Sequence, residues 1–133
     1  MSHLVDSDWV ADWLKGRQAA IDLLTALAPD GLAISIITVG EIYEGIYYGQ
    51  NRQRHERGFR QFRRLVKVLP ITERVAKRFA VIRGELRQRG RTIGDPDLLI
   101  GATALEHDLT LVTRNRRHFQ EIPGRKLYEE QHP

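Results

Sequence analysis

The stretch that decides the fold is GDPDLLIGATALEH, at residues 94–107. Asp95 and Pro96 fit the N-cap and the first position of a helix, and Asp97 then falls in the first turn, where free backbone N–H groups favour an anion. The residues that follow are nearly all apolar or small, so this helix has little polar face and must be buried. Gly101 lets its backbone approach a sheet closely. A buried helix with its acids at the first turn directs those acids at a ligand or partner.

Short apolar strands alternate with helices on both sides of this stretch. The predicted strands are residues 3–5, 32–37 and 109–113, with weaker ones at 68–71 and 126–128. Apolar residues recur at helical spacing between them, in residues 9–14, 20–27, 38–48, 52–67 and 73–88. This alternation predicts an α/β fold of three layers, α/β/α, with a short, mainly parallel central sheet. We expect residues 1–133 to form one domain.

Composition restricts the compartment of the protein. The chain contains no cysteine, which excludes disulfides and thiolate metal sites and suits a reducing cytosol. No apolar run approaches the roughly 20 residues of a membrane span, and Asp6 and Asp8 interrupt the N-terminal apolar run, so no signal peptide is predicted. We therefore expect a soluble, cytoplasmic protein without a membrane partner.

Basic charge is concentrated in residues 50–67. This segment carries seven basic residues and one acid, whereas the whole chain has a formal net charge of +4. Such a segment indicates a polyanion partner, although a solvated helix face explains it equally well. The candidates for contacts with a polyanion are Arg57, Arg60 and Arg64. An apolar stripe of Phe59, Phe62, Val66 and Leu69 predicts an amphipathic helix, whose aromatic rings we expect to pack rather than stack on bases.

Three acids follow strands or begin the helix of the opening stretch. Asp6 lies directly after the first strand, Glu41 about one turn after the second, and Asp97 in the first turn of residues 94–107. Ligands of α/β sheets gather at the carboxyl edge of the strands, so we expect these acids to converge there, with Asp8 and Asp95 as further candidates. Carboxylates this close repel one another unless a cation is present, and oxygen ligands suit Mg²⁺ or Mn²⁺.

Each of the three acids also has a purely structural explanation. Asp6 fits a helix N-cap, Glu41 fits a capping box that starts at Thr38, and Asp97 complements a helix dipole. Capping does not require that every such acid lie at the same edge of the sheet. The shared edge therefore favours a site.

Four motifs in this order resemble those of the PIN-domain nucleases and, within them, the VapC-type toxins of type II toxin–antitoxin pairs. The motifs are HLVDSD at 3–8, SIITVGEI at 35–42, PDLLIGATA at 96–104, and LVTRN at 111–115 with Phe119 after it. The resemblance covers nearly the whole chain. It implies a metal-dependent endoribonuclease that cuts a cellular RNA, such as tRNA or rRNA, and that is inhibited by a cognate antitoxin. It also implies a homodimer or a larger toxin–antitoxin assembly.

The resemblance also assigns roles to residues by motif position. It implies that the catalytic, metal-binding acids are Asp6, Glu41 and Asp97. The chain departs from the family pattern after Thr113, where His118 stands at a position that is an acid in many relatives. Asn115 could then supply a neutral oxygen ligand. His118 could contact phosphate, but a surface histidine is the simpler explanation, because the sequence reveals no carboxylate partner for it.

Other polar residues near the same edge complete the expected site. The hydroxyls of Ser7 and Thr113 could orient a carboxylate or a water molecule. The residues expected where phosphate approaches are Arg114, Arg116 and Arg117. Two alternatives use the same residues: a non-catalytic binding module with an acidic socket for a basic partner peptide, and a DNA- or flap-directed nuclease of the same fold.

Overall fold

A computed structural model describes residues 1–129, which form five strands, seven α-helices and one short 3-10 helix. The elements in order are β1 (His3–Val5), α1 (Ser7–Leu14), α2 (Gln18–Leu27), η1 (Ala28–Asp30), β2 (Leu32–Ser35), α3 (Ile36–Tyr48), α4 (Arg52–Phe62), β3 (Val66–Leu69), α5 (Glu73–Gln88), α6 (Asp95–Glu106), β4 (Thr110–Val112), α7 (Arg116–Phe119) and β5 (Lys126–Leu127). Over the described residues, no helix combines the length and apolar character needed to cross a membrane.

The five strands form one parallel sheet in the order β3-β2-β1-β4-β5. Leu4 of β1 pairs with Ala33 on one side and with Leu111 on the other, so the first strand lies in the middle. The chain builds outward from β1 to β3 and then returns to add β4 and β5 on the opposite side. Strand order therefore reverses beside β1, which is where ligands bind in open α/β sheets.

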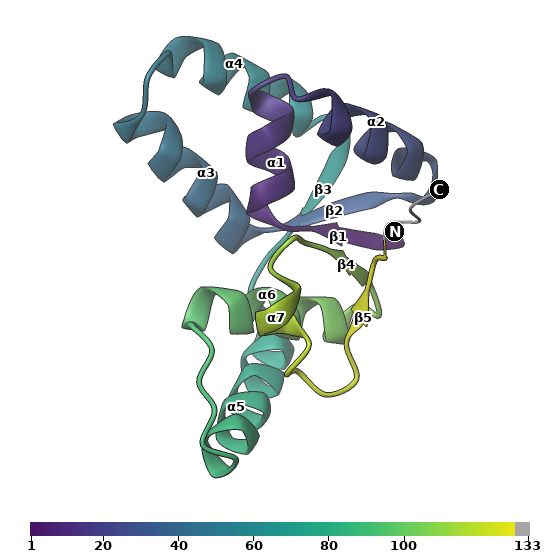
Figure 1. The fold of residues 1–133 in the computed structure, drawn as a ribbon, viewed down its shortest axis with the longest axis vertical. Coiled ribbons are helices and arrows are strands. Elements are labelled where there is room, and N and C mark those ends of the chain that lie inside the picture. Colours follow the sequence, from purple (N-terminus) through teal and green to yellow (C-terminus); the bar gives the residue numbers. More distant parts are fainter. Residues whose placement is uncertain (130–133) are drawn as a thin grey trace.

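Helices cover both faces of the sheet, which confirms the predicted three-layer α/β/α fold (Figure 1). On one face, Val5, Ile34 and Val112 share a buried core with side chains of α1 to α4. On the other face, the strand residues pack against α5, α6 and the α7 segment; they are Leu4, Ala33 and Leu111. A sheet covered on both faces requires apolar residues at successive strand positions, as the sequence has.

The basic helix α4 ends earlier than its apolar stripe predicts. Phe59 and Phe62 are fully buried, as expected for packing residues. Helical bonding stops when the N–H of Leu65 bonds to the carbonyl of Phe62, and Val66 begins β3. The prediction that Val66 belongs to this helix is therefore wrong. So is the predicted start of the strand, because β3 begins two residues earlier, where Val66 pairs with Leu32.

Helix α3 begins before the capping box that the sequence predicts. Its N-cap is Ser35, whose hydroxyl accepts a hydrogen bond from the N–H of Ile37 at 3.0 Å. Thr38 is fully buried within the helix and does not cap it. β2 ends at Ser35, which leaves that side chain at the free N–H groups of the first turn. Glu41 is consequently not a partner of a Thr38 cap.

Candidate active site at the carboxyl edge of the sheet

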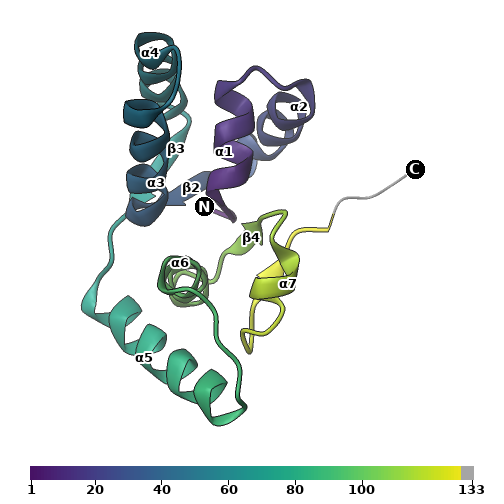
Figure 2. The ribbon, with the colours of Figure 1, turned by 60° about the vertical axis from the view of Figure 1, so that its left-hand side comes forward.

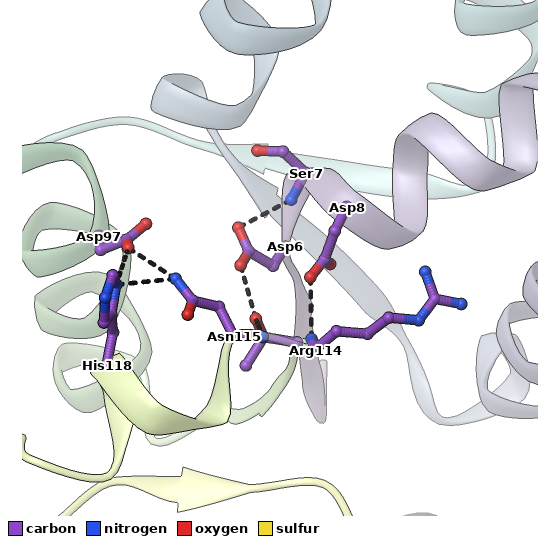
Figure 3. Close-up of polar contacts among 8 residues, drawn as sticks. Asp6, Ser7, Asp8, Asp97, Arg114, Asn115 and His118 are labelled. Atoms are coloured by element: carbon purple, nitrogen blue, oxygen red, sulfur yellow. Dashed lines mark hydrogen bonds and ion pairs between the residues drawn. The ribbon is translucent and has the colours of Figure 1, made fainter.

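Asp6 is the most buried of the three acids, with 6% of its surface exposed. It follows β1 and is the N-cap of α1, so its capping role is real. Its Oδ1 accepts the N–H of Ser7 at 2.8 Å, and its Oδ2 accepts the hydroxyl of Thr113 at 2.7 Å (Figure 3). Burial raises the pKa of Asp6 to about 6, with a smaller contribution from the charges of Asp8 and Asp97, and the hydrogen bonds from Thr113 and Ser7 offset this only in part.

Ser7 links Asp6 to Glu41. Its backbone N–H donates to Asp6, while its hydroxyl donates to Oε1 of Glu41 at 2.6 Å. Glu41 lies on α3, and its exposed side chain reaches α1 through this bond. One serine therefore holds two carboxylates from different elements at the same edge.

Asp97 lies in the first turn of α6 and faces α7. Its Oδ2 accepts a hydrogen bond from Nδ2 of Asn115 at 3.0 Å and lies 3.1 Å from Nδ1 of His118 (Figure 3). The amide nitrogen of Asn115, not its oxygen, thus faces this acid. His118 has a carboxylate partner after all, and the prediction of an unpartnered surface histidine is wrong. The two residues are 21 positions apart and meet because α6 and α7 pack together.

Hydrogen bonds join these residues into one continuous chain. The remaining link is between Asn115, whose N–H donates to the hydroxyl of Thr113 at 3.0 Å, and Thr113, which donates to Asp6. We call this set the acid network; its members are Glu41, Ser7, Asp6, Thr113, Asn115, Asp97 and His118. Its members lie on α3, α1, α6 and α7, at the N-caps of α1 and α7, and directly after β4. The structure thus connects all three acids that the sequence singles out.

The oxygen donors of the acid network suit a hard divalent cation. Among residues 1–129, no Lys or Arg side chain pairs with Asp6, Glu41 or Asp97. The same part of the chain places no three Asp, Glu, His or Cys side chains close enough to share one ion as they stand. Magnesium sites commonly use only one or two carboxylates, with water and substrate oxygens as the other ligands. The donor set therefore fits Mg²⁺ or Mn²⁺.

The two further acidic candidates point elsewhere. Both oxygens of Asp8 accept backbone N–H groups, from Trp9 at 2.7 Å and from Arg114 at 2.9 Å. Asp95 is the first residue of α6, whose N-cap is Gly94, so the prediction that Asp95 caps this helix is wrong. Its carboxylate is half exposed and pairs with Arg83 of α5 at 3.6 Å. Neither acid is hydrogen-bonded to the acid network.

The arginines predicted to meet phosphate differ in how free they are. Arg114 stacks 3.8 Å above the ring of Trp9 and pairs with Asp12. Arg116 donates to the carbonyl of Tyr128 at 2.7 Å and pairs with Glu129. Arg117 is exposed and has no ion-pair partner within residues 1–129. The remaining three are exposed on or just after α4, in the helical layer above the sheet (Figure 1); they are Arg57, Arg60 and Arg64.

The contact between Asn115 and His118 was not anticipated from the sequence. Their nitrogens, Nδ2 and Nδ1, lie 2.9 Å apart. The available signal was the spacing of three residues around a helical turn, which places two side chains next to each other. It was not decisive because α7 is only four residues long and has no periodic pattern of its own.

Comparisons with known proteins identify the family of this chain. A profile of the PIN domain matches residues 4–125. Ribonuclease VapC1 of Methanocaldococcus jannaschii is 34% identical over 128 residues, which are 95% of this chain and 86% of that protein. Ribonuclease VapC10 of Mycobacterium tuberculosis is 38% identical over 117 residues, which are 87% of this chain and 84% of that protein. Among solved structures, this chain resembles one chain of the crystal structure of VapBC2 from Rickettsia felis bound to a DNA fragment from its promoter. The TM-score is 0.90 and the sequence identity 25%, over 98% of this chain and 100% of that chain. This chain belongs to the PIN-domain family, in its VapC group.

Proposed function

We propose that this protein is a metal-dependent endoribonuclease, the toxin of a type II toxin–antitoxin pair. The observation that carries the proposal is the acid network, which ties Asp6, Glu41 and Asp97 together where the strand order reverses. Relatives with the name ribonuclease align over most of the chain and support the reaction class. The proposed substrate is a cellular RNA, with tRNA or rRNA as the first to test.

Asp6 and Asp97, with Glu41, would hold Mg²⁺ or Mn²⁺. A divalent ion bound there supplies an activated water and stabilises the charge that develops on the phosphate. Thr113 and Ser7 fix both oxygens of Asp6, so that its carboxylate keeps one orientation. At Asp97, the bonds recorded within residues 1–129 all involve Oδ2, which leaves Oδ1 available to a ligand.

Glu41 and His118 offer polar atoms to the ion and to the substrate. Ser7 bonds Oε1 of Glu41, so Oε2 remains available to hold the ion, either directly or through a bound water molecule. His118 uses Nδ1 toward Asp97, and its ring is half exposed, so Nε2 can meet a phosphate oxygen or the leaving oxygen. These two residues thus lie on the two sides of Asp6 and Asp97 along the acid network.

The proposed protein partners are a cognate antitoxin and a second copy of this chain. A groove between α1 and α3 is apolar along Leu14 and Ile46 and ends at the acids Asp8 and Glu41. An antitoxin segment with apolar residues and one basic side chain would match it, and the same groove would serve the binding-module alternative. For the homodimer, the exposed rings of α3 offer a surface; they are Tyr47 and Tyr48.

The substitution Asp97→Asn tests the reaction. It removes a charge at the acid network while keeping the shape of the side chain, so we expect RNA cleavage and growth arrest to be lost and the melting temperature to be kept. The matched control is Asp95→Asn, two residues away in the same turn, because Asp95 pairs with Arg83 outside the network. Cleavage is measured on purified RNA and on DNA of the same sequence.

Three outcomes would contradict the proposal. If Asp97→Asn still cleaves RNA, or melts well below the wild type, then this acid serves the helix dipole alone. If the wild type cuts the DNA strand but not the RNA strand, the DNA-directed alternative is correct.

A further inference from the structure

A basic groove opens beside the acid network on the side of His118. It lies between the segment 89–93, which connects α5 to α6, and α7, and its volume is about 450 Å³. Figure 2 shows this connecting segment running past α6 on the side of α7. Pockets of about 300–1,000 Å³ are large enough for a bound ligand. The groove meets the network at His118, whose Nδ1 is 3.1 Å from Asp97.

The charge of this groove is positive and partly unpaired. Three arginines and one acid line it: Arg89, Arg91, Arg117 and Glu121. Arg91 donates to Glu121 at 2.9 Å, so these two charges neutralise each other. Arg89 and Arg117 are exposed, and neither has an acidic partner within residues 1–129. Guanidinium groups without a partner bind phosphate oxygens in a fixed, two-pronged geometry.

Other grooves that meet the acid network have charges that suit RNA less well. One of them, on α3, is lined by Glu41 and Glu44 and by no basic residue. The groove between α1 and α3 contains two acids, Asp8 and Glu41, and one basic residue, Lys15. Its acidic charge therefore exceeds its basic charge, which disfavours a polyanion. The groove beside Trp9 contains two arginines, and each already has an acidic partner; the pairs are Arg114–Asp12 and Arg116–Glu129. Of these grooves, only the one at His118 has more basic than acidic side chains together with arginines that lack an acidic partner within residues 1–129.

We propose that the groove formed by Arg89, Arg91 and Arg117 is the track along which the backbone of a single-stranded RNA leaves the acid network. This inference rests on the proposed ribonuclease function and adds the direction of the bound strand. Arg117 is next to His118 and would meet the phosphate nearest the cleaved bond, and Arg89 would meet one further away. The basic residues of α4 lie over the opposite face of the sheet and are outside this track (Figure 1).

The test compares three variants that each lose two positive charges. Arg89→Gln with Arg117→Gln removes the unpaired charges of the groove, Arg57→Gln with Arg60→Gln removes two from α4, and Arg74→Gln with Lys77→Gln is a control on exposed positions of α5. A fluorescein-labelled 20-nucleotide single-stranded RNA of mixed sequence is titrated with each full-length protein in EDTA, where cleavage does not interfere. Fluorescence anisotropy gives the dissociation constant at a series of salt concentrations from about 0.05 to about 0.5 M, a range that includes the 0.1 M at which the variants are compared.

The slope of log K against log[salt] is negative, and each phosphate contact with single-stranded RNA contributes about 0.7 to its magnitude. For the groove variant, which loses two such contacts, we expect this magnitude to decrease by about 1.4. This corresponds to binding about 25-fold weaker at 0.1 M salt, with the difference shrinking as salt rises. The other two variants should keep the wild-type slope. With Mg²⁺ added, the groove variant should show a raised KM for RNA and a nearly unchanged kcat.

Three results would overturn the inference, and they are distinguishable from one another. If the wild type cleaves RNA and the groove variant keeps its slope and KM, the track lies elsewhere while the ribonuclease function stands. If the α4 variant alone loses binding, the strand follows Arg57 and Arg60 instead. If the wild type neither binds nor cleaves RNA, the proposed function fails together with the track. Melting curves of all variants in EDTA verify that each protein is folded.

Discussion

The carboxyl group of Asp6 makes the stability of this protein depend on pH. Its pKa is raised from 3.8 to about 6. The folded protein therefore binds this proton more tightly than the unfolded chain does. The stability that the proton contributes is fully present below the unfolded pKa of 3.8 and is lost as the pH rises through the folded pKa of about 6. Metal binding needs the charged form, so it should strengthen over the same interval.

The substitution Asp6→Asn should remove this pH dependence. In EDTA, we expect the free energy of unfolding of the wild type to fall between pH 4 and pH 7 by up to about 3 kcal/mol relative to the variant, given 1.36 kcal/mol for each pKa unit. Urea unfolding at a series of pH values measures the difference. Asp95→Asn, at a half-exposed acid, should follow the wild type. Parallel curves for Asp6→Asn and wild type would mean that Asp6 ionises normally.

His118 should act on the metal through Asp97. Because it meets Oδ2 of Asp97, replacing it by alanine removes a contact that orients the carboxylate that we propose as a metal ligand. Losses of this kind weaken metal binding about 10- to 100-fold. Calorimetric titration with Mn²⁺ measures the affinity, and His118→Gln, which keeps a polar atom near Asp97, should recover part of it. An unchanged affinity in the alanine variant would assign His118 to the substrate alone.

At the scale of elements, α6 can pack closely against the α7 segment because Gly101 has no side chain. A Cβ at this position would lie 2.5 Å from Cδ1 of Ile122, which is fully buried. The close approach predicted for this glycine thus exists, but its partner is the segment after α7 rather than the sheet. The contact matters for the site, because α6 carries Asp97 and α7 carries His118.

Gly101→Ala should therefore destabilise the protein by about 1 kcal/mol. Overpacking costs about 1–3 kcal/mol, and the higher helix propensity of alanine offsets about 1 kcal/mol of this cost. The double variant Gly101→Ala with Ile122→Val lacks the clashing Cδ1, so its free energy of unfolding should equal or exceed that of the wild type. Gly84→Ala, in the interior of α5 with no atom within 4 Å of the added Cβ, should stabilise by up to about 1 kcal/mol. Thermal and urea unfolding give these values. A loss of stability that persists in the double variant would point to the backbone of α6 instead.

The long periodic helix α5 could be predicted from the sequence, whereas the N-caps of α3 and α6 could not. The apolar spacing of α5 gave its bounds as the structure has them, because burial of one face depends on local sequence. The start of α3 depends on where β2 stops pairing, and Ser35 rather than Thr38 then caps the helix. Contacts such as Asp97 with His118 depend on how two helices pack, which no local pattern encodes. The positions of Asp6 and Asp97 were predictable because Asp6 follows a strand and Asp97 lies in the first turn of a helix. Glu41 instead lies in the second turn of α3 and reaches the acid network through Ser7.

At the scale of the whole molecule, metal binding should stabilise the fold. An ion at about 100 times its dissociation constant adds roughly 2.7 kcal/mol to the free energy of unfolding. We expect Mg²⁺ or Mn²⁺ to raise the melting temperature of the wild type and to leave a triple variant unchanged; its substitutions are Asp6→Asn, Glu41→Gln and Asp97→Asn. Differential scanning fluorimetry with and without EDTA makes the comparison. A wild type that does not respond to either ion would argue against a metal at the acid network.

The central position of β1 also affects when the site forms during synthesis. Asp6 bonds to Thr113, 107 residues later in the chain, and Asp8 bonds to the N–H of Arg114, 106 residues later. A growing chain that still lacks β4 has all three acids but neither the strand that fills the place beside β1 nor the hydroxyl that orients Asp6. We therefore expect nascent chains on the ribosome to be harmless until residues 110–113 have been made and have left the ribosome. The order of strands in the sheet would in that way delay the onset of toxicity until β4 has been made.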